Sequence, residues 1–158
     1  MDSTIDREIV ISRVIDAVPT LVFEAFTTVQ HLSRWWGPTG FTTTTRSFDF
    51  RVGGEWEFVM HGPDGTDYPE WIVWTDIVAP ERIVMLHGEH RDDPDAFESH
   101  LTFVPDGDRT RIEMRTVFPT PELRDRAIER HGALEGGRQT LANLAIHVAD
   151  MAIARGER

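Results

Sequence analysis

Residues 41–118 contain one extended segment after another, and this run constrains the fold more than any other feature of the sequence. Within residues 55–61, apolar side chains alternate with mainly polar ones, the apolar ones being Trp56, Phe58 and Met60. Alternation with a period of two predicts a β-strand that buries one face. The stretches GPDG at 62–65 and PDGD at 105–108 are typical of hairpin turns. The run therefore predicts an antiparallel sheet, and the strands expected over the whole chain are 7–15, 41–50, 55–61, 71–78, 82–90, 97–104 and 110–118.

Helical patterns lie on both sides of this run. Two short helices are predicted after the first strand, one beginning at Pro19 and one over residues 29–34, which Gly37-Pro38 ends. A short polar helix is predicted within residues 119–132 with Thr120 as its N-cap. A long helix over residues 133–154 follows, with the apolar stripe Leu134, Leu141, Leu144, Ala145, Val148 and Ala152. This order predicts an α+β fold with the helices on one face of the sheet.

The length and charge of the chain limit what it binds and where it works. A chain of 158 residues predicts one domain, 1–158, with a core over about 7–154. A net charge of −11 argues against partners with many phosphates, so we expect neither nucleic acid nor a membrane surface as a partner. The chain lacks cysteine, and its first residues, MDSTIDREIV, do not resemble a secretory signal. We therefore expect a cytoplasmic protein.

Two motifs at a fixed spacing carry a resemblance to a known family: WWGP at 35–38 and FDFRVGGEW at 48–56. Further parts of the pattern are VFEAF at 22–26, PERIV at 80–84 and the Leu-rich terminal helix. With these motifs, residues 7–151 resemble the bacterial, stand-alone members of the activator-of-heat-shock-protein-ATPase (Aha-type) family. That family belongs to the START-like (SRPBCC) superfamily, with the helix-grip fold that birch pollen allergens and polyketide cyclases share.

The resemblance implies a curved antiparallel sheet of about seven strands that grips the C-terminal helix, with two short helices after the first strand. It also implies a ligand cavity between sheet and helix, but it leaves the activity open. Our leading hypothesis is a small-molecule-binding protein that needs no cofactor and takes an apolar or amphipathic ligand. We expect the polar contacts to be Arg46 and His87 and the cavity lining to be Trp36, Trp56, Phe58, Met85, Met114, Gly137, Leu141 and Leu144.

The last helix departs from the family pattern at Gly137. Family members commonly carry Gly-Trp near the start of this helix, where this chain has Gly136-Gly137. On a helical projection Gly137 shares a stripe with Leu141, so it should face the sheet. The missing side chain predicts either a cavity enlarged at this end or a large residue that fills the space, such as Trp71 or Trp74.

Histidine and carboxylate side chains near the end of the fifth predicted strand raise two alternatives. A cyclase-like or hydratase-like enzyme would use His87, which shares a strand face with Met85, together with Glu89. A divalent metal site would use the same two side chains with His61 or His100 from neighbouring strands. The spacing is looser than in established metal motifs, so the sequence predicts no metal site.

A second apolar stripe on the long helix consists of Ala142, Ile146, Ala149 and Ile153. If residues 119–132 do not cover it, this stripe predicts a homodimer, because exposed apolar patches often mark interfaces. A further functional alternative, an interaction module for a chaperone ATPase, follows from the family name alone.

Overall fold

The computed structural model describes residues 3–156 and has the predicted α+β architecture. The prediction of one domain over 1–158 also takes in residues 1, 2, 157 and 158, which lie outside the described residues. The strands are β1 (Glu8–Ile15), β2 (Thr42–Phe48), β3 (Glu55–His61), β4 (Asp67–Val78), β5 (Arg82–Gly88), β6 (Phe97–Asp106) and β7 (Arg109–Val117). The helices are a 3-10 turn η1 (Ile5–Arg7), α1 (Pro19–Glu24), α2 (Val29–Trp35), α3 (Pro121–His131) and α4 (Ala133–Ala154).

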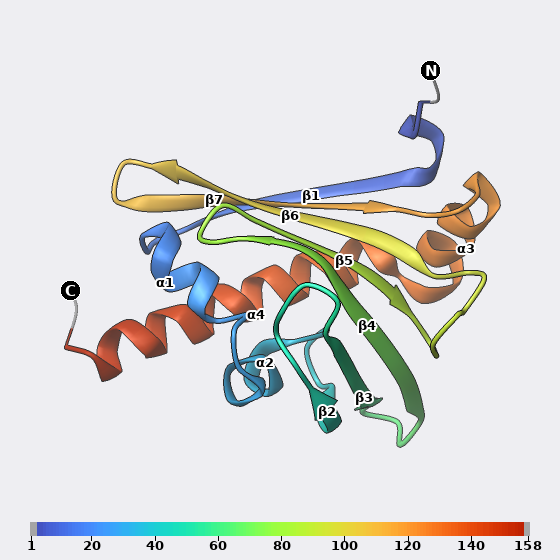
Figure 1. Cartoon of the computed structure of the whole chain (residues 1–158), viewed down its shortest axis with the longest axis horizontal. Helices are drawn as coiled ribbons and strands as arrows, with labels where there is room; N and C mark the ends of the chain where they lie inside the picture. Colours follow the sequence, from blue (N-terminus) through green and yellow to red (C-terminus); the bar gives the residue numbers. More distant parts are fainter. Residues whose placement is uncertain (1–2, 157–158) are drawn as a thin grey trace.

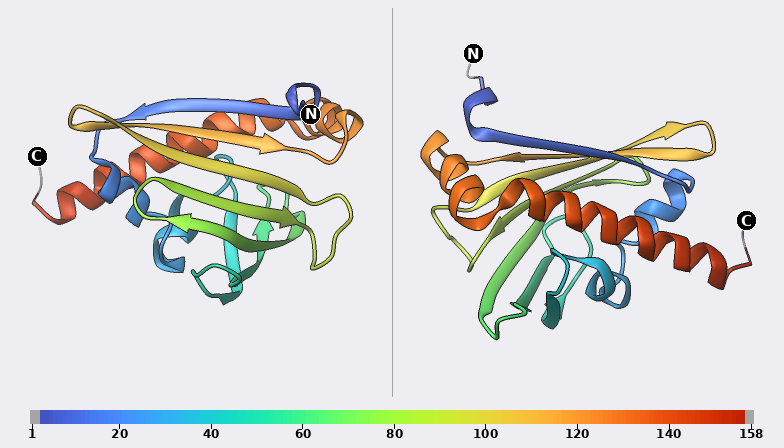
Figure 2. Two further views of the ribbon diagram at one scale, coloured as in Figure 1. Left: turned by 45° about the horizontal axis from the view of Figure 1, so that its top comes forward. Right: turned by 180° about the vertical axis from the view of Figure 1, so that it is seen from behind.

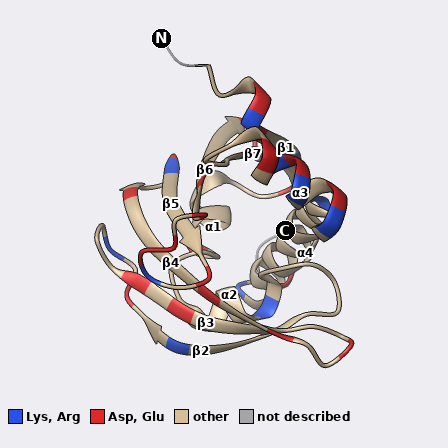
Figure 3. Cartoon of the chain, turned by 90° about the vertical axis from the view of Figure 1, so that its right-hand side faces the viewer, with Lys and Arg blue, Asp and Glu red and all other residues tan. Residues whose placement is uncertain are grey.

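All seven strands belong to one antiparallel sheet with the order β1-β7-β6-β5-β4-β3-β2. The chain therefore runs as a meander from β2 to β7, and β1 pairs with the last strand. The sheet curves from β1 round to β2, and α4 lies along its concave side (Figure 1). Seen end-on, the strands form an arc that opens towards α4 (Figure 3). This arrangement confirms the predicted helix-grip fold.

Local sequence explains where the helices begin. Thr28 and Thr120 cap α2 and α3, their hydroxyl oxygens accepting hydrogen bonds from the amides of His31 and Leu123. Gly132 separates α3 from α4 in the left-handed conformation, with φ of 60°, which glycine adopts without a steric penalty. This break lets α4 turn back across the concave face, as the rear view in Figure 2 shows.

Several strands differ from the prediction at their ends, and β4 and β5 show the physical reasons. β4 begins at Asp67 because the hairpin pairs the polar stretch before Trp71 with β3, in the register His61 to Asp67. β5 ends at Gly88, because the Glu89 amide donates to the Asp93 carboxylate at 2.9 Å and the chain leaves the sheet.

Aromatic rings fill the concave side beneath α1 and α2. Phe23 of α1 lies 5.3 Å from Phe103 of β6, measured between ring centroids, and Trp56 and Trp74 are fully buried. Such rings bury large apolar areas and dominate core energetics. Within residues 3–156, none of the helices has the length and apolar character that crossing a membrane requires.

Candidate functional site

His87 of β5 points to the concave side of the sheet because of its place in the strand. Its register partners are Ile72 of β4 and Phe97 of β6, and Ile72 is fully buried on that side. The His87 ring lies 4.7 Å from the ring of Phe97 and 6.2 Å from the ring of Trp36. Strand parity thus places one titratable side chain among aromatic rings.

Glu70 of β4 is the partner of this histidine, and we call the two the His87–Glu70 pair. His87 Nε2 and Glu70 Oε1 are 3.2 Å apart, and the side chains are 12% and 19% exposed. A carboxylate held this far from water is costly unless it is hydrogen-bonded or paired. The pair is therefore a largely buried polar contact on an otherwise apolar surface.

The two tryptophans of the WWGP motif have different environments. Trp35 is buried, and its indole Nε1 donates to the Ala25 carbonyl oxygen at 3.0 Å. Trp36 is half-buried, and its ring contacts both Trp56, at 5.3 Å, and His87. Trp35 thus fixes α2 to the turn after α1, while Trp36 connects the aromatic core with the His87–Glu70 pair.

A small cavity lies beside Trp36, between the sheet and α4. Its volume is about 20 Å³, enough for about one water molecule. Drug-sized ligands occupy pockets of about 300–1,000 Å³. The cavity beside Trp36 is therefore too small for such a ligand, because the described side chains fill most of the space there. The lining consists of Phe26, Trp35, Trp36, Met85, Ser99, Leu101, Met114, Thr140 and Leu141.

The predicted lining residues other than Gly137 divide into two groups. Trp36, Met85, Met114 and Leu141 do line this cavity. Trp56, Phe58 and Leu144 are buried in the surrounding core instead. Sequence analysis missed Phe26, Trp35, Ser99, Leu101 and Thr140, although the alternation in β6 and the helical spacing in α4 could have indicated the last three.

Two predicted polar residues lie away from the concave side. Arg46 is exposed because it is the extra residue of a β-bulge between Thr45 and Ser47, where strict alternation fails. Glu89 is exposed because it follows the end of β5, so strand parity does not apply to it. The expected partnership of His87 with Glu89 is therefore wrong, and Glu70 holds that position.

Gly137 faces the sheet, as the helical projection predicts, but it does not enlarge the cavity. A Cβ atom built on Gly137 would lie 2.3 Å from Ile11 Cδ1 and 3.3 Å from Met114 Cε. Ile11 of β1 occupies the space, so neither Trp71 nor Trp74 is the filler. Trp71 lies on the outer face, where its Nε1 donates to Glu55 Oε1 at 2.7 Å.

The histidines considered for a metal site do not come together. His61 Nδ1 lies 2.7 Å from an Asp67 oxygen and His100 Nε2 lies 2.6 Å from a Glu98 oxygen, both on the outer face. Over residues 3–156, no group of three or more potential ligand side chains is arranged to hold a metal ion.

A second histidine pair joins α2 to α4, remote from β5. His31 Nδ1 and His147 Nε2 are 2.9 Å apart, and His147 is buried. Burial lowers the pKa of His147, and the positive charges of His31 and Arg34 lower it further, while Asp150 acts in the opposite direction. This contact is a helix-to-helix hydrogen bond that requires at least one neutral ring.

The apolar stripe on α4 stays partly uncovered. Ile146 and Ile153 are 62% and 74% exposed, so α3 does not cover them. The homodimer through Ala142, Ile146, Ala149 and Ile153 stays a prediction.

The fold of the whole chain is similar to those of several solved bacterial proteins. A solution structure from Arthrobacter aurescens is 25% identical with a TM-score of 0.84, and the match covers 95% of this chain and 90% of that chain. A crystal structure from Nitrosomonas europaea is 21% identical with a TM-score of 0.84, covering 97% and 99% of the two chains. The AHSA1 protein of Silicibacter pomeroyi is 23% identical with a TM-score of 0.73, covering 90% and 97%.

Two further comparisons used the amino-acid sequence, one with curated proteins and one with protein families. No curated protein matches the chain. The pattern of the family described as "Activator of Hsp90 ATPase homolog 1-like protein" matches residues 16–149, which is most of the sequence. The chain, with its START-like helix-grip fold, therefore belongs to the Activator of Hsp90 ATPase homolog 1-like family.

Proposed function

We propose that the protein binds a small apolar or amphipathic molecule on the concave face of its sheet, with the His87–Glu70 pair as the polar contact. The observation that carries this proposal is a hydrogen-bonded His–Glu pair directed into a surface of aromatic rings. Ligand sites combine a mostly apolar lining with a few placed polar groups in this way. The START-like fold of the family, which commonly binds ligands, also supports it.

The ligand enters by displacing side chains, because the existing cavity of about 20 Å³ is too small for it. Three side chains of the lining suit this movement. Met85 and Met114 have flexible, unbranched side chains that repack easily. Trp36 is half-buried and is the last residue before Gly37, whose φ is 93°. A ligand that prefers the opened arrangement shifts the population towards it.

The hydrogen bond to Glu70 gives His87 a defined role. It engages Nε2, and no described residue bonds to Nδ1 of the same ring. In the tautomer whose Nε2–H donates to Glu70, Nδ1 is an acceptor for a hydroxyl or amide group of the ligand. The ligand chemistry that this supports is an apolar skeleton with one hydrogen-bond donor.

Native mass spectrometry of freshly purified protein tests this proposal. We expect a bound small molecule on the wild type, lost under denaturing conditions, and at least tenfold lower occupancy on His87→Leu. The matched control is His100→Leu, because His100 also pairs with a carboxylate, that of Glu98, but on the outer face. Equal occupancy in both variants, or a wild type that carries no molecule and takes up none from a lipid extract, would contradict the proposal.

The same hydrogen bond favours one alternative function, proton-transfer catalysis. A carboxylate that orients a histidine is a common arrangement for general acid–base chemistry. The test is to return the recovered molecule to ligand-free protein and follow it by mass spectrometry. Conversion by the wild type but not by Glu70→Gln would identify an enzyme, and an unchanged molecule would leave binding as the function.

A further inference from the structure

The strand β1 is one edge of the sheet, and among residues 3–156 it presents a row of backbone groups that pair with no strand besides β7. The Phe118 amide donates to the Arg7 carbonyl oxygen at 2.8 Å, so these two residues form a hydrogen-bonded pair. Such pairs alternate along an antiparallel ladder, so the odd-numbered residues of β1 bond to β7. The even-numbered residues Val10, Ser12 and Val14 therefore direct their N–H and C=O groups away from the sheet.

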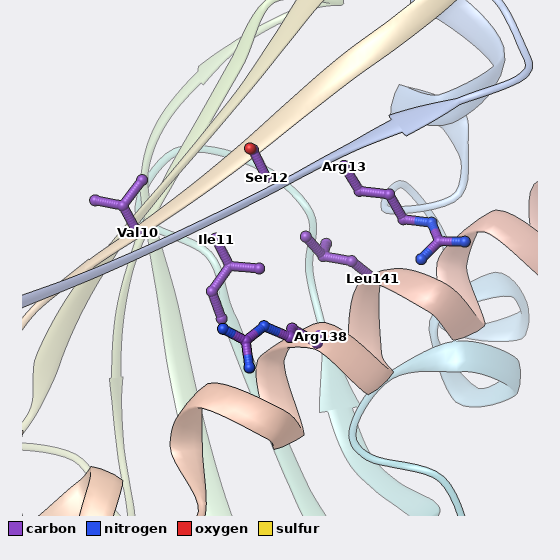
Figure 4. Close-up of a pocket in the computed structure, with 6 residues that line it drawn as sticks. All are labelled: Val10, Ile11, Ser12, Arg13, Arg138 and Leu141. Carbon is purple, nitrogen blue, oxygen red and sulfur yellow. The ribbon is translucent and has the colours of Figure 1, made fainter.

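A groove runs between this edge and α4. Its volume is about 350 Å³, and its lining is Val10, Ile11, Ser12, Arg13, Arg138 and Leu141. Figure 4 shows Ile11 and Arg13 pointing from β1 towards α4, where Arg138 lies beside Ile11. Leu141 alone is shared with the small interior cavity, so the groove is separate from the His87–Glu70 pair.

The groove carries two guanidinium groups that form no ion pair with a carboxylate of the described residues. Over residues 3–156, the arginines in ion pairs are Arg51, Arg82, Arg91, Arg111, Arg115, Arg124 and Arg155. Arg13 and Arg138 are not among them, although the chain has 27 acidic residues against 16 basic ones. Guanidinium groups pair best with carboxylates, often through two parallel hydrogen bonds. Two such groups beside one groove therefore match an acidic ligand.

We propose that the groove binds an acidic peptide in extended conformation, which adds to β1 as a further strand. Its backbone would pair with Val10, Ser12 and Val14, as in other complexes in which a peptide extends a sheet. Alternate side chains of an added strand point to the same face. The peptide side chains that point towards α4 carry the carboxylates that bind Arg13 and Arg138.

A second copy of β1 does not meet these requirements. When two copies pair edge to edge, their outward-facing, even-numbered residues lie opposite one another. Arg13 then falls opposite an odd-numbered residue, and these are Ile9, Ile11, Arg13 and Ile15. None of them is acidic, so a partner strand with glutamate or aspartate at alternate positions suits the groove better.

Titration of the labelled wild type with two peptides tests the proposal by nuclear magnetic resonance. One peptide alternates valine with glutamate, and the other alternates valine with lysine. We expect the glutamate peptide alone to bind and to shift the amide signals of Val10, Ser12 and Val14 most strongly. Equal binding of both peptides, or shifts confined to other strands, would overturn the proposal.

Two variants separate the backbone contribution from the charge contribution. Ser12→Pro removes an outward N–H and leaves the bonds to β7 intact, so we expect at least tenfold weaker binding from a folded protein. The double variant R13E/R138E should prefer the lysine peptide, whereas Arg109→Glu, at an exposed arginine outside the groove, should behave like the wild type. Full binding by a folded Ser12→Pro variant would show that no strand is added and would contradict the inference.

Discussion

The concave face of the sheet has two halves that differ in how they are covered. In the filled half, beneath α1 and α2, rings such as Phe26, Trp56 and Trp74 pack without exposure. In the polar half, towards the start of α4, the His87–Glu70 pair lies beside the rings of Trp36 and Phe97, which are only partly buried. Both halves belong to the same strands and follow the same alternation. The comparison shows that the His87–Glu70 pair lies where the short helices no longer cover the sheet.

Replacing a large side chain in each half should give the largest difference in the free energy of unfolding. We expect Trp56→Ala to lower the free energy of unfolding by about 3–5 kcal/mol, because it leaves a cavity in close-packed rings. His87→Leu should cost less, about 1–3 kcal/mol, because leucine keeps the apolar contacts and the loss comes from leaving the largely buried Glu70 carboxylate without its partner. Urea unfolding of both variants measures the difference. Similar losses would mean that the polar half supports the fold as much as the filled half does.

The indole N–H groups within the filled half offer a finer comparison. Trp56 Nε1 donates to Thr45 Oγ1 at 3.1 Å, whereas Trp74 Nε1 is buried without a partner among the described residues. Replacement by phenylalanine removes a similar ring area from each. Trp56→Phe should therefore cost about 1 kcal/mol more than Trp74→Phe. Denaturant midpoints at equal slope provide the measurement, and the reverse order would contradict the hydrogen-bond argument.

The adjacent glycines of α4 test how closely the helix approaches β1 near the polar half. Gly136→Ala should stabilise the protein by about 0.8–1 kcal/mol through helix propensity, because its Cβ would meet only Pro38 Cγ at 3.5 Å. Gly137→Ala should lose most of this gain, because its Cβ would lie 2.3 Å from Ile11 Cδ1.

Removing that methyl group provides the control. In an Ile11→Val background the clash disappears, so Gly137→Ala should become more favourable by about 0.5–1 kcal/mol. Additive effects in a thermal unfolding cycle would show that the helix is not held against Ile11.

The smallest expected effect is the loss of stability at acidic pH that comes from His147, which contacts His31 at the filled half. The folded-state pKa of His147 lies below its ordinary value of 6.5, chiefly because of burial. Its contribution to stability is therefore present above pH 6.5 and is lost as the pH falls through the lowered pKa, by at most about 1.4 kcal/mol per pH unit. His147→Gln should flatten this dependence, and the exposed His131→Gln should not. Unfolding curves that keep the same pH dependence in both variants would exclude His147 as the cause.

Sequence reasoning predicted those features that depend on local pattern. Alternation within β5 was sufficient to place His87 on the concave side, and helical spacing was sufficient to turn Gly137 towards the sheet. Glu70 was missed because the polar stretch around Pro69 resembles a loop, and it is a strand only through pairing with β3, opposite Phe58. Arg46 was misplaced because a bulge interrupts the alternation.

The size of the cavity could not be predicted at all. It depends on how rings from α1, α2 and four strands fill one space, and no local pattern determines that packing. The sequence also could not predict that Ile11 occupies the space next to Gly137, because the two residues lie far apart in the chain.

The position of Trp36 has an optical consequence. Its indole lies between Trp56 in the filled half and His87 in the polar half. A molecule that reaches the histidine must change the surroundings of this indole, and the emission maximum of an indole depends on the polarity of those surroundings. The protein therefore carries its own fluorescent reporter, and Trp36→Phe would identify its share of the emission without any attached dye.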